Sequence, residues 1–116
     1  MAYGLHLTID QREWRAGDFS SADKLTGTIY TDEDKTTAKD LTGYSVQSII
    51  YKQGGSANFS KTATIVTAAN GTWSYAVADG EMVPQGIYLI ECELTKSGER
   101  ISTFPEDFLV SRSPVA

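Results

Sequence analysis

The chain has little of the chemistry from which most catalytic, metal-binding and disulfide-stabilised sites are built. Of its 116 residues, only Cys92 is a cysteine and only His6 is a histidine. A single cysteine cannot form an intrachain disulfide, and one cysteine with one histidine cannot supply the four ligands of a typical structural zinc site. Disulfide scaffolds and four-ligand Cys/His zinc sites are therefore excluded.

An excess of basic residues and a long apolar segment are also missing. The chain has 10 Lys and Arg against 15 Asp and Glu, which gives a net charge of −5. Nucleic acids and anionic membranes attract clusters of Lys and Arg, and this composition disfavours both as partners. The longest apolar runs are too short to span a bilayer, and the first ten residues lack the features of a signal peptide. We therefore expect a protein made in the cytoplasm, with no nucleic-acid or membrane partner.

Alternation of apolar and polar residues is the dominant pattern of the sequence. In one segment, Trp73, Tyr75 and Val77 fall on one face of a predicted strand and should enter the core. Asn70-Gly71 precedes this strand and is typical of a tight turn. Further segments of strand composition cover residues 5–9, 25–31, 44–52, 62–66, 87–94, 100–104 and 107–110. Seven or more short strands without a helical period predict one all-β domain over residues 1–116, an antiparallel sandwich.

The residues that could carry catalysis or bind a metal all have a structural interpretation that we favour. His6 alternates with core-type leucines and should face outward, whereas Cys92 falls in the apolar register of its strand and should be a small buried side chain. The acidic segment 31–40 lacks the glycine and closing glutamate of a calcium-binding loop. Glu91 and Glu93 share the outer face of one strand. We therefore expect no catalytic residue, no metal site and no cofactor.

Residues 11–24 break the alternation and are predicted to form a long loop or an edge segment. Trp14 lies in this segment beside Arg15, and Phe19 follows closely. Tryptophan and arginine are enriched where protein interfaces concentrate their binding energy, which favours a partner-binding role. The alternative is that Trp14 folds back and caps the sandwich. The sequence favours neither interpretation over the other.

Four motifs occur in an order that carries a family resemblance: DLTGYSV (40–46), NGTWSY (70–75), PQGIY (84–88) and FLV (108–110). Over residues 25–111 the series resembles the immunoglobulin-like N-terminal domain of the phage baseplate upper protein family. The resemblance implies an immunoglobulin-like antiparallel β-sandwich of about seven to eight strands. It also implies a virion structural role without catalytic residues. Baseplate members of the family continue into further domains, and this chain ends at Ala116, so a stand-alone accessory or decoration protein is expected.

The expected function is therefore docking on a phage major capsid protein or on a tail or baseplate protein, with self-assembly around a symmetry axis as a further option. The contact residues predicted for this role are Trp14, Arg15, Phe19 and Tyr3. The alternative function is a carbohydrate-binding module displayed on the virion. That function needs at least two exposed, coplanar aromatic rings, for which Trp14 and Tyr30 or Tyr51 are the candidates. An enzymatic function is not expected.

Overall fold

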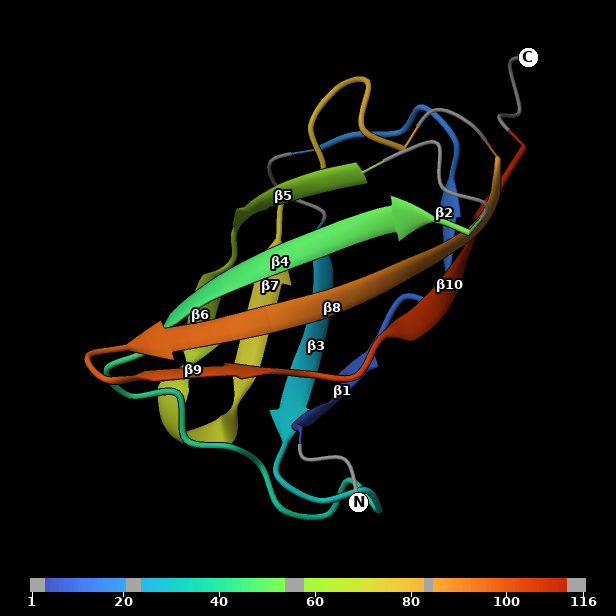
Figure 1. Cartoon of the computed structure of the whole chain (residues 1–116). Helices are drawn as coiled ribbons and strands as arrows, with labels where there is room; N and C mark the ends of the chain where they lie inside the picture. The colour runs from blue at the N-terminus through green and yellow to red at the C-terminus, as the bar shows by residue number, and fades with distance from the viewer. Residues whose placement is uncertain (1–3, 21–23, 54–57, 83–84, 113–116) are drawn as a thin grey trace.

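Two β-sheets packed face to face make up the fold (Figure 1). The computed structural model describes residues 4–20, 24–53, 58–82 and 85–112. In chain order these residues form β1 (His6–Ile9), β2 (Glu13–Arg15), β3 (Leu25–Tyr30), β4 (Ser45–Lys52), β5 (Asn58–Thr62), β6 (Thr64–Thr67), the 3-10 turn η1 (Ala68–Asn70), β7 (Thr72–Tyr75), β8 (Gly86–Lys96), β9 (Glu99–Ser102) and β10 (Glu106–Ser111). The predicted all-β sandwich is confirmed.

The order of strands within each sheet is that of an immunoglobulin fold. One sheet has the order β1-β3-β7-β6, which corresponds to strands A, B, E and D. The other contains β10-β8-β4, which corresponds to G, F and C, and it is extended by β2 at one edge and β5 at the other. Among the described strands all pairs are antiparallel except β2 with β10, which run parallel.

The described residues form ten strands, more than the seven to eight expected, because two strands are interrupted. The first strand leaves one sheet after β1 and continues in the other sheet as β2. The last strand is divided into β9 and β10, which pair with successive parts of β8. Counting each interrupted strand once gives eight, in agreement with the expectation.

The core lies between the sheets and contains the side chains that the alternation predicted. Trp73 and Tyr75 on β7 are fully buried, Val77 follows them into the core, and Cys92 on β8 is buried as well. Trp73 fits because its neighbour on β3 is Gly27. A Cβ atom at that position would lie only 2.6 Å from the Trp73 ring and 2.0 Å from the Thr8 carbonyl oxygen. The close approach of the indole to the backbone therefore requires glycine.

The predicted turn at Asn70-Gly71 is present, but only Gly71 adopts the left-handed conformation. The 3-10 turn η1 is capped by Gly71, which has a φ of 70° and whose N–H donates to the Ala68 carbonyl at 3.1 Å. The Gly71 carbonyl then accepts a hydrogen bond from the Ile29 amide at 2.9 Å. The turn thereby ties the start of β7 to the end of β3.

Candidate partner interface

Residues 11–24, which break the alternation, contain the edge strand β2 (Glu13–Arg15). An edge segment was one of the two structures predicted for this region, and a long loop was the other. The register of β2 with β10 places Trp14 opposite Val110 and Arg15 opposite Ser111. Just beyond β2, the Gly17 amide donates to the Met82 carbonyl at 2.8 Å. Gly17 itself has a φ of 86°, which allows the chain to turn sharply after β2. Backbone hydrogen bonds therefore fix this edge to two distant parts of the chain.

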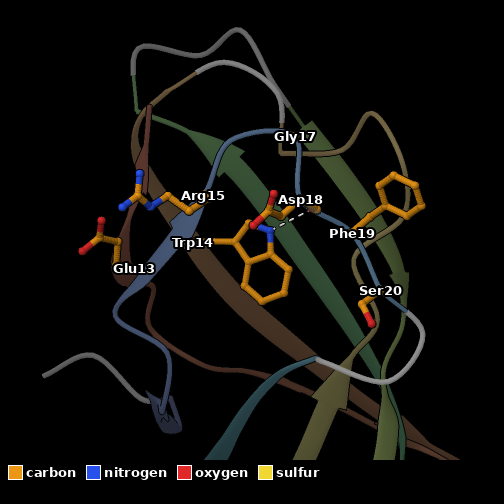
Figure 2. A pocket seen from close by; sticks show the side chains of 7 residues that line it. All are labelled: Glu13, Trp14, Arg15, Gly17, Asp18, Phe19 and Ser20. Atoms are coloured by element: carbon orange, nitrogen blue, oxygen red, sulfur yellow. Dashed lines mark hydrogen bonds between the residues drawn. The ribbon is translucent and has the colours of Figure 1, made fainter. Parts of the chain in front are cut away.

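Trp14 combines features of both roles proposed for it. Its indole is half-buried and packs against the core, as expected for a cap. The indole Nε1 donates a hydrogen bond of 3.0 Å to the Asp18 carbonyl and so closes the turn that follows β2 (Figure 2). The exposed part of the same side chain lines a surface pocket. Capping the sandwich and presenting an apolar surface are thus compatible at this position.

The pocket has a volume of about 480 Å³ and is formed by one short segment. The residues that line it are Glu13, Trp14, Arg15, Gly17, Asp18, Phe19 and Ser20. Phe19 is 55% exposed, a high value for a large apolar side chain, and Figure 2 shows its ring directed away from the half-buried indole. The pocket lining therefore combines two aromatic residues with the charged residues Glu13, Arg15 and Asp18.

Arg15 lines the same pocket, but its side chain leaves β2 on the side opposite to the Trp14 indole. Side chains alternate along β2, and Trp14 faces inward. Figure 2 shows Glu13 and Arg15 on the opposite side of β2 from the indole. The Arg15 guanidinium donates to the Arg112 carbonyl at 3.2 Å, at the outer face of the six-stranded sheet. Of the four predicted contact residues, Trp14, Arg15 and Phe19 all line the pocket, and Tyr3 lies outside the described residues.

A polar cluster that the sequence did not predict is connected to the pocket segment through the Gly17–Met82 hydrogen bond. Glu81 accepts hydrogen bonds from the Tyr75 hydroxyl at 3.1 Å and from the Ala78 amide at 2.7 Å, and it forms an ion pair with Lys61 at 3.2 Å. Burial, together with the neighbouring Glu81 carboxylate, raises the pKa of Tyr75 and keeps its hydroxyl protonated. The cluster holds the backbone around Ala78 and Glu81, next to Met82, whose carbonyl accepts the hydrogen bond from the Gly17 amide.

The aromatic residues considered for sugar binding do not form one platform. Tyr30 ends β3 in the four-stranded sheet, whereas Tyr51 lies on β4 in the six-stranded sheet. Trp14 lies on the edge strand β2, with its indole directed toward the core. Sugar stacking needs rings on one common surface, so the described positions of these three side chains give a carbohydrate-binding role no support.

The single cysteine is in an environment that suppresses its reactivity. Cys92 is fully buried, with its Sγ atom 3.7 Å from the Ser48 hydroxyl. Burial raises the pKa of the thiol to about 12, so the nucleophilic thiolate is scarce at neutral pH. His6 lies against the exposed ring of Phe104, with 5.1 Å between the ring centroids. Neither residue has the partner that would activate it as a nucleophile or base in the described structure.

Within the described ranges, no group of three or more His, Cys, Asp or Glu side chains is placed to hold a metal ion. The same part of the chain contains no helix with the length and apolar character needed to cross a bilayer.

Comparison with known proteins identified no relative from which a function can be transferred. No protein-family model matches the chain. No curated protein matches it either. Among solved structures, the soluble domain of PmoD from Methylocystis sp. strain Rockwell is similar, with 14% sequence identity and a TM-score of 0.47. The alignment covers 96% of this chain and 94% of that domain. A similarity at this level supports no conclusion about function.

Proposed function

We propose that this chain is a non-enzymatic structural protein of a phage virion, an immunoglobulin-like module that docks on a capsid or tail protein. In this proposal it is a decoration or accessory protein on the surface of the head or tail. The virion role rests on the resemblance of the ordered sequence motifs to the baseplate family domain. The docking role rests on one structural observation, which is that the exposed Phe19 and the half-buried Trp14 line the same surface pocket.

The position of these two rings favours binding without a large cost of ordering. Trp14 is held by core contacts and by its hydrogen bond to Asp18, and the surrounding backbone is anchored to β10 and to Met82. A surface that is ordered before binding loses less conformational entropy when a partner docks. Burying the Phe19 ring and the rest of the indole would then supply apolar contact area at the centre of an interface.

The charge around the pocket indicates what the partner should present. Asp18 is exposed at the pocket, and the chain as a whole is acidic. We therefore expect the partner to place an apolar or aromatic side chain in the pocket, with a basic residue close to Asp18. On a virion, many identical contacts act together, so that a modest affinity at each site is sufficient.

Mass spectrometry of particles purified from a lysate of the producing cells tests the proposal. We expect to find the chain in the particles at a reproducible copy number. A number close to that of the main head or tail protein would identify a decoration protein, and a much lower number would identify a baseplate or vertex component. Absence of the chain from purified particles would overturn the proposed function.

A further inference from the structure

The outer faces of the two sheets differ in a way that the pocket does not explain. On the four-stranded sheet, outward-facing neighbours such as Thr8, Thr28 and Thr72 form rows of hydroxyl side chains. Such a face is typical of a sheet that remains in water. The outward positions of the six-stranded sheet include a group of apolar side chains instead.

These apolar side chains form a continuous stripe that runs diagonally over the neighbouring strands β10, β8 and β4 (Figure 1). Leu109 on β10 lies opposite Ile87 on β8, and these residues are 39% and 41% exposed. Leu89 follows on β8 and lies opposite Tyr51 on β4, two residues beyond Ile49. We call Leu109, Ile87, Leu89, Tyr51 and Ile49 the apolar stripe. A contiguous apolar surface of this kind marks an interaction site more often than isolated exposed side chains do.

A row of carboxylates follows one side of the apolar stripe. We call Glu13 on β2, Asp107 on β10 and Glu91 on β8 the acidic row. In the strand register these residues lie opposite three members of the stripe, which are Leu109, Leu89 and Ile49 in that order. Asp107 is 3.3 Å from Arg12, whereas Glu13 and Glu91 form no ion pair with any described residue. The acidic row therefore has a carboxylate without an ion pair at each end.

The opposite side of the stripe has no such row of charge. Gln53 follows β4 there, and its amide donates to the Ile87 carbonyl at 2.8 Å. Ser60 on β5 lies opposite Ile49. Both side chains are uncharged, so the negative charge borders the stripe along one side.

The basic residues of the six-stranded sheet do not border the stripe. The strand register gives neither Arg15 nor Arg100 a member of the stripe as its cross-strand neighbour. Arg100 lies 4.0 Å from Glu93 instead. Lys52 follows Tyr51 on β4 and therefore points to the other face of that strand. A partner that covers the stripe thus meets apolar side chains and, along one side, carboxylates.

From this pattern we infer that the outer face of the six-stranded sheet binds a different protein, through a segment that has an apolar ridge with lysine or arginine residues along one side. The ridge covers the apolar stripe, and the basic residues pair with the acidic row, which both attracts and orients the segment. A second copy of this chain does not supply the matching charge, because no row of basic residues borders its own stripe.

This inference goes beyond the docking role proposed for the pocket and does not rest on it. The two surfaces meet at Glu13, which belongs to the acidic row and also lines the pocket. Substitutions at Ile87, Leu109 and Glu91, which do not line the pocket, therefore test the stripe separately.

Site-specific photo-crosslinking of the full chain in the cells that produce it tests the inference. The photoreactive amino acid p-benzoylphenylalanine replaces Ile87, where its rings keep the stripe apolar, and mass spectrometry identifies the crosslinked peptide. We expect a crosslink to a different protein, at a segment that combines apolar residues with several lysine or arginine residues. The matched control places the same amino acid at Val66, a 60% exposed apolar residue on β6 in the other sheet, and should give no such crosslink. A crosslink at Ile87 no stronger than that at Val66, a crosslink to a second copy of this chain, or one to a segment without basic residues would overturn the inference.

A charge reversal tests the role of the acidic row. The crosslinked segment is made as a labelled synthetic peptide, and fluorescence anisotropy measures its binding to the purified full chain. We expect Glu91→Lys to weaken binding roughly tenfold or more, because it replaces an attraction for the basic residues by a repulsion. Leu109→Lys should weaken binding to a similar extent, because it places a charge in the apolar contact. Asp79→Lys is the matched control, since it makes the same change of charge at an exposed residue in the loop that follows β7, and it should bind like the wild type.

Circular dichroism checks that each variant is folded. Glu91→Gln and Ile87→Lys replace Glu91→Lys and Leu109→Lys if the latter do not fold, and Glu91→Gln should weaken binding less than a reversal of charge. Wild-type affinity of the variants at Glu91 or at Leu109 and Ile87 would overturn the inference. An Asp79→Lys variant weakened as much as Glu91→Lys would also overturn it, because the peptide would then respond only to the net charge of the chain.

Discussion

The two tryptophans of the chain lie in regions that are built differently. Trp73 is fully buried between the sheets, where Gly27 leaves room for its ring and its Nε1 has no hydrogen-bond partner. Trp14 is half-buried at the edge strand β2, where its Nε1 is bonded to the Asp18 carbonyl. Shape complementarity therefore holds the first indole, and a local turn holds the second. The comparison indicates that Trp73 determines the fold, whereas Trp14 mainly organises a surface.

Trp73→Ala should have the largest effect on stability. It leaves a cavity in the core, and removal of a buried large aromatic side chain costs about 3–5 kcal/mol of unfolding free energy. Urea denaturation followed by circular dichroism measures the loss. Trp73→Phe is the control and should cost less, because the lost N–H group has no partner to leave unsatisfied. A Trp73→Ala variant as stable as the wild type would contradict the assignment of this ring to the core.

High pH should also destabilise the core region, through Cys92. Its pKa is raised from an ordinary value of 9.0 to about 12 in the folded chain, so the folded state holds this proton more tightly than the unfolded state. The resulting stability is present below pH 9 and is lost as the pH rises toward 12, by about 1.4 kcal/mol per pH unit. The raised pKa of Tyr75 acts in the same direction at pH values above 10.

Urea denaturation of the wild type and of Cys92→Ala at several pH values between 8 and 11 separates the contribution of Cys92 to the alkaline loss of stability from that of Tyr75. We expect the stability of Cys92→Ala to fall less steeply with pH than that of the wild type. Equal slopes would show that the thiol does not contribute to the alkaline loss. Substitution of Trp14, which has no titratable group, should leave the slope unchanged and thus distinguishes the two regions.

Trp14→Ala should have an intermediate effect on stability. The variant loses the partial burial of the indole and one hydrogen bond, which together amount to about 1–2 kcal/mol. Trp14→Phe keeps most of the ring contact and lacks the N–H donor, so it should recover part of the loss. Urea denaturation again measures both variants. A loss as large as that of Trp73→Ala would make Trp14 a core residue, and no loss would remove its role as a cap.

Phe19→Ala should have the smallest effect on stability. The ring is 55% exposed, and a surface substitution of this kind usually changes the unfolding free energy by no more than about 0.5 kcal/mol. Thermal unfolding of the wild type and the variant in the same buffer measures the difference. A clear destabilisation would show that the ring is held by the fold, and would weaken the proposal that it is reserved for a partner.

The parts of the fold that the sequence predicted are those that a local pattern determines. Alternation placed Trp73, Tyr75 and Cys92 in the core because strand side chains point to opposite faces in turn. The strand β2 was harder to recognise, because its three residues are stabilised by parallel pairing with β10, almost a hundred residues away. A pairing between segments so distant in the chain leaves no periodic signal in the shorter one.

The candidate site was predicted in part for the same reason. Proximity in the chain placed Trp14, Arg15 and Phe19 in one group, and the structure does bring all three to the rim of one pocket. The side-chain direction of Arg15 follows only once residues 13–15 are known to form a strand. The acceptor for the Trp14 indole is the Asp18 backbone carbonyl, which a side-chain motif cannot reveal.

Incorporation of variants into particles tests the central claim, that the Trp14–Phe19 pocket docks this module on a virion. Phe19→Ala is compared with Phe104→Ala, which removes the same kind of side chain, 40% exposed, at the contact with His6. Each variant is expressed in place of the wild-type chain, and its copy number in purified particles is measured by mass spectrometry. We expect Phe19→Ala to be folded but strongly depleted from particles and Phe104→Ala to be incorporated normally. Normal incorporation of Phe19→Ala, or absence of the wild-type chain from the particles, would contradict the account.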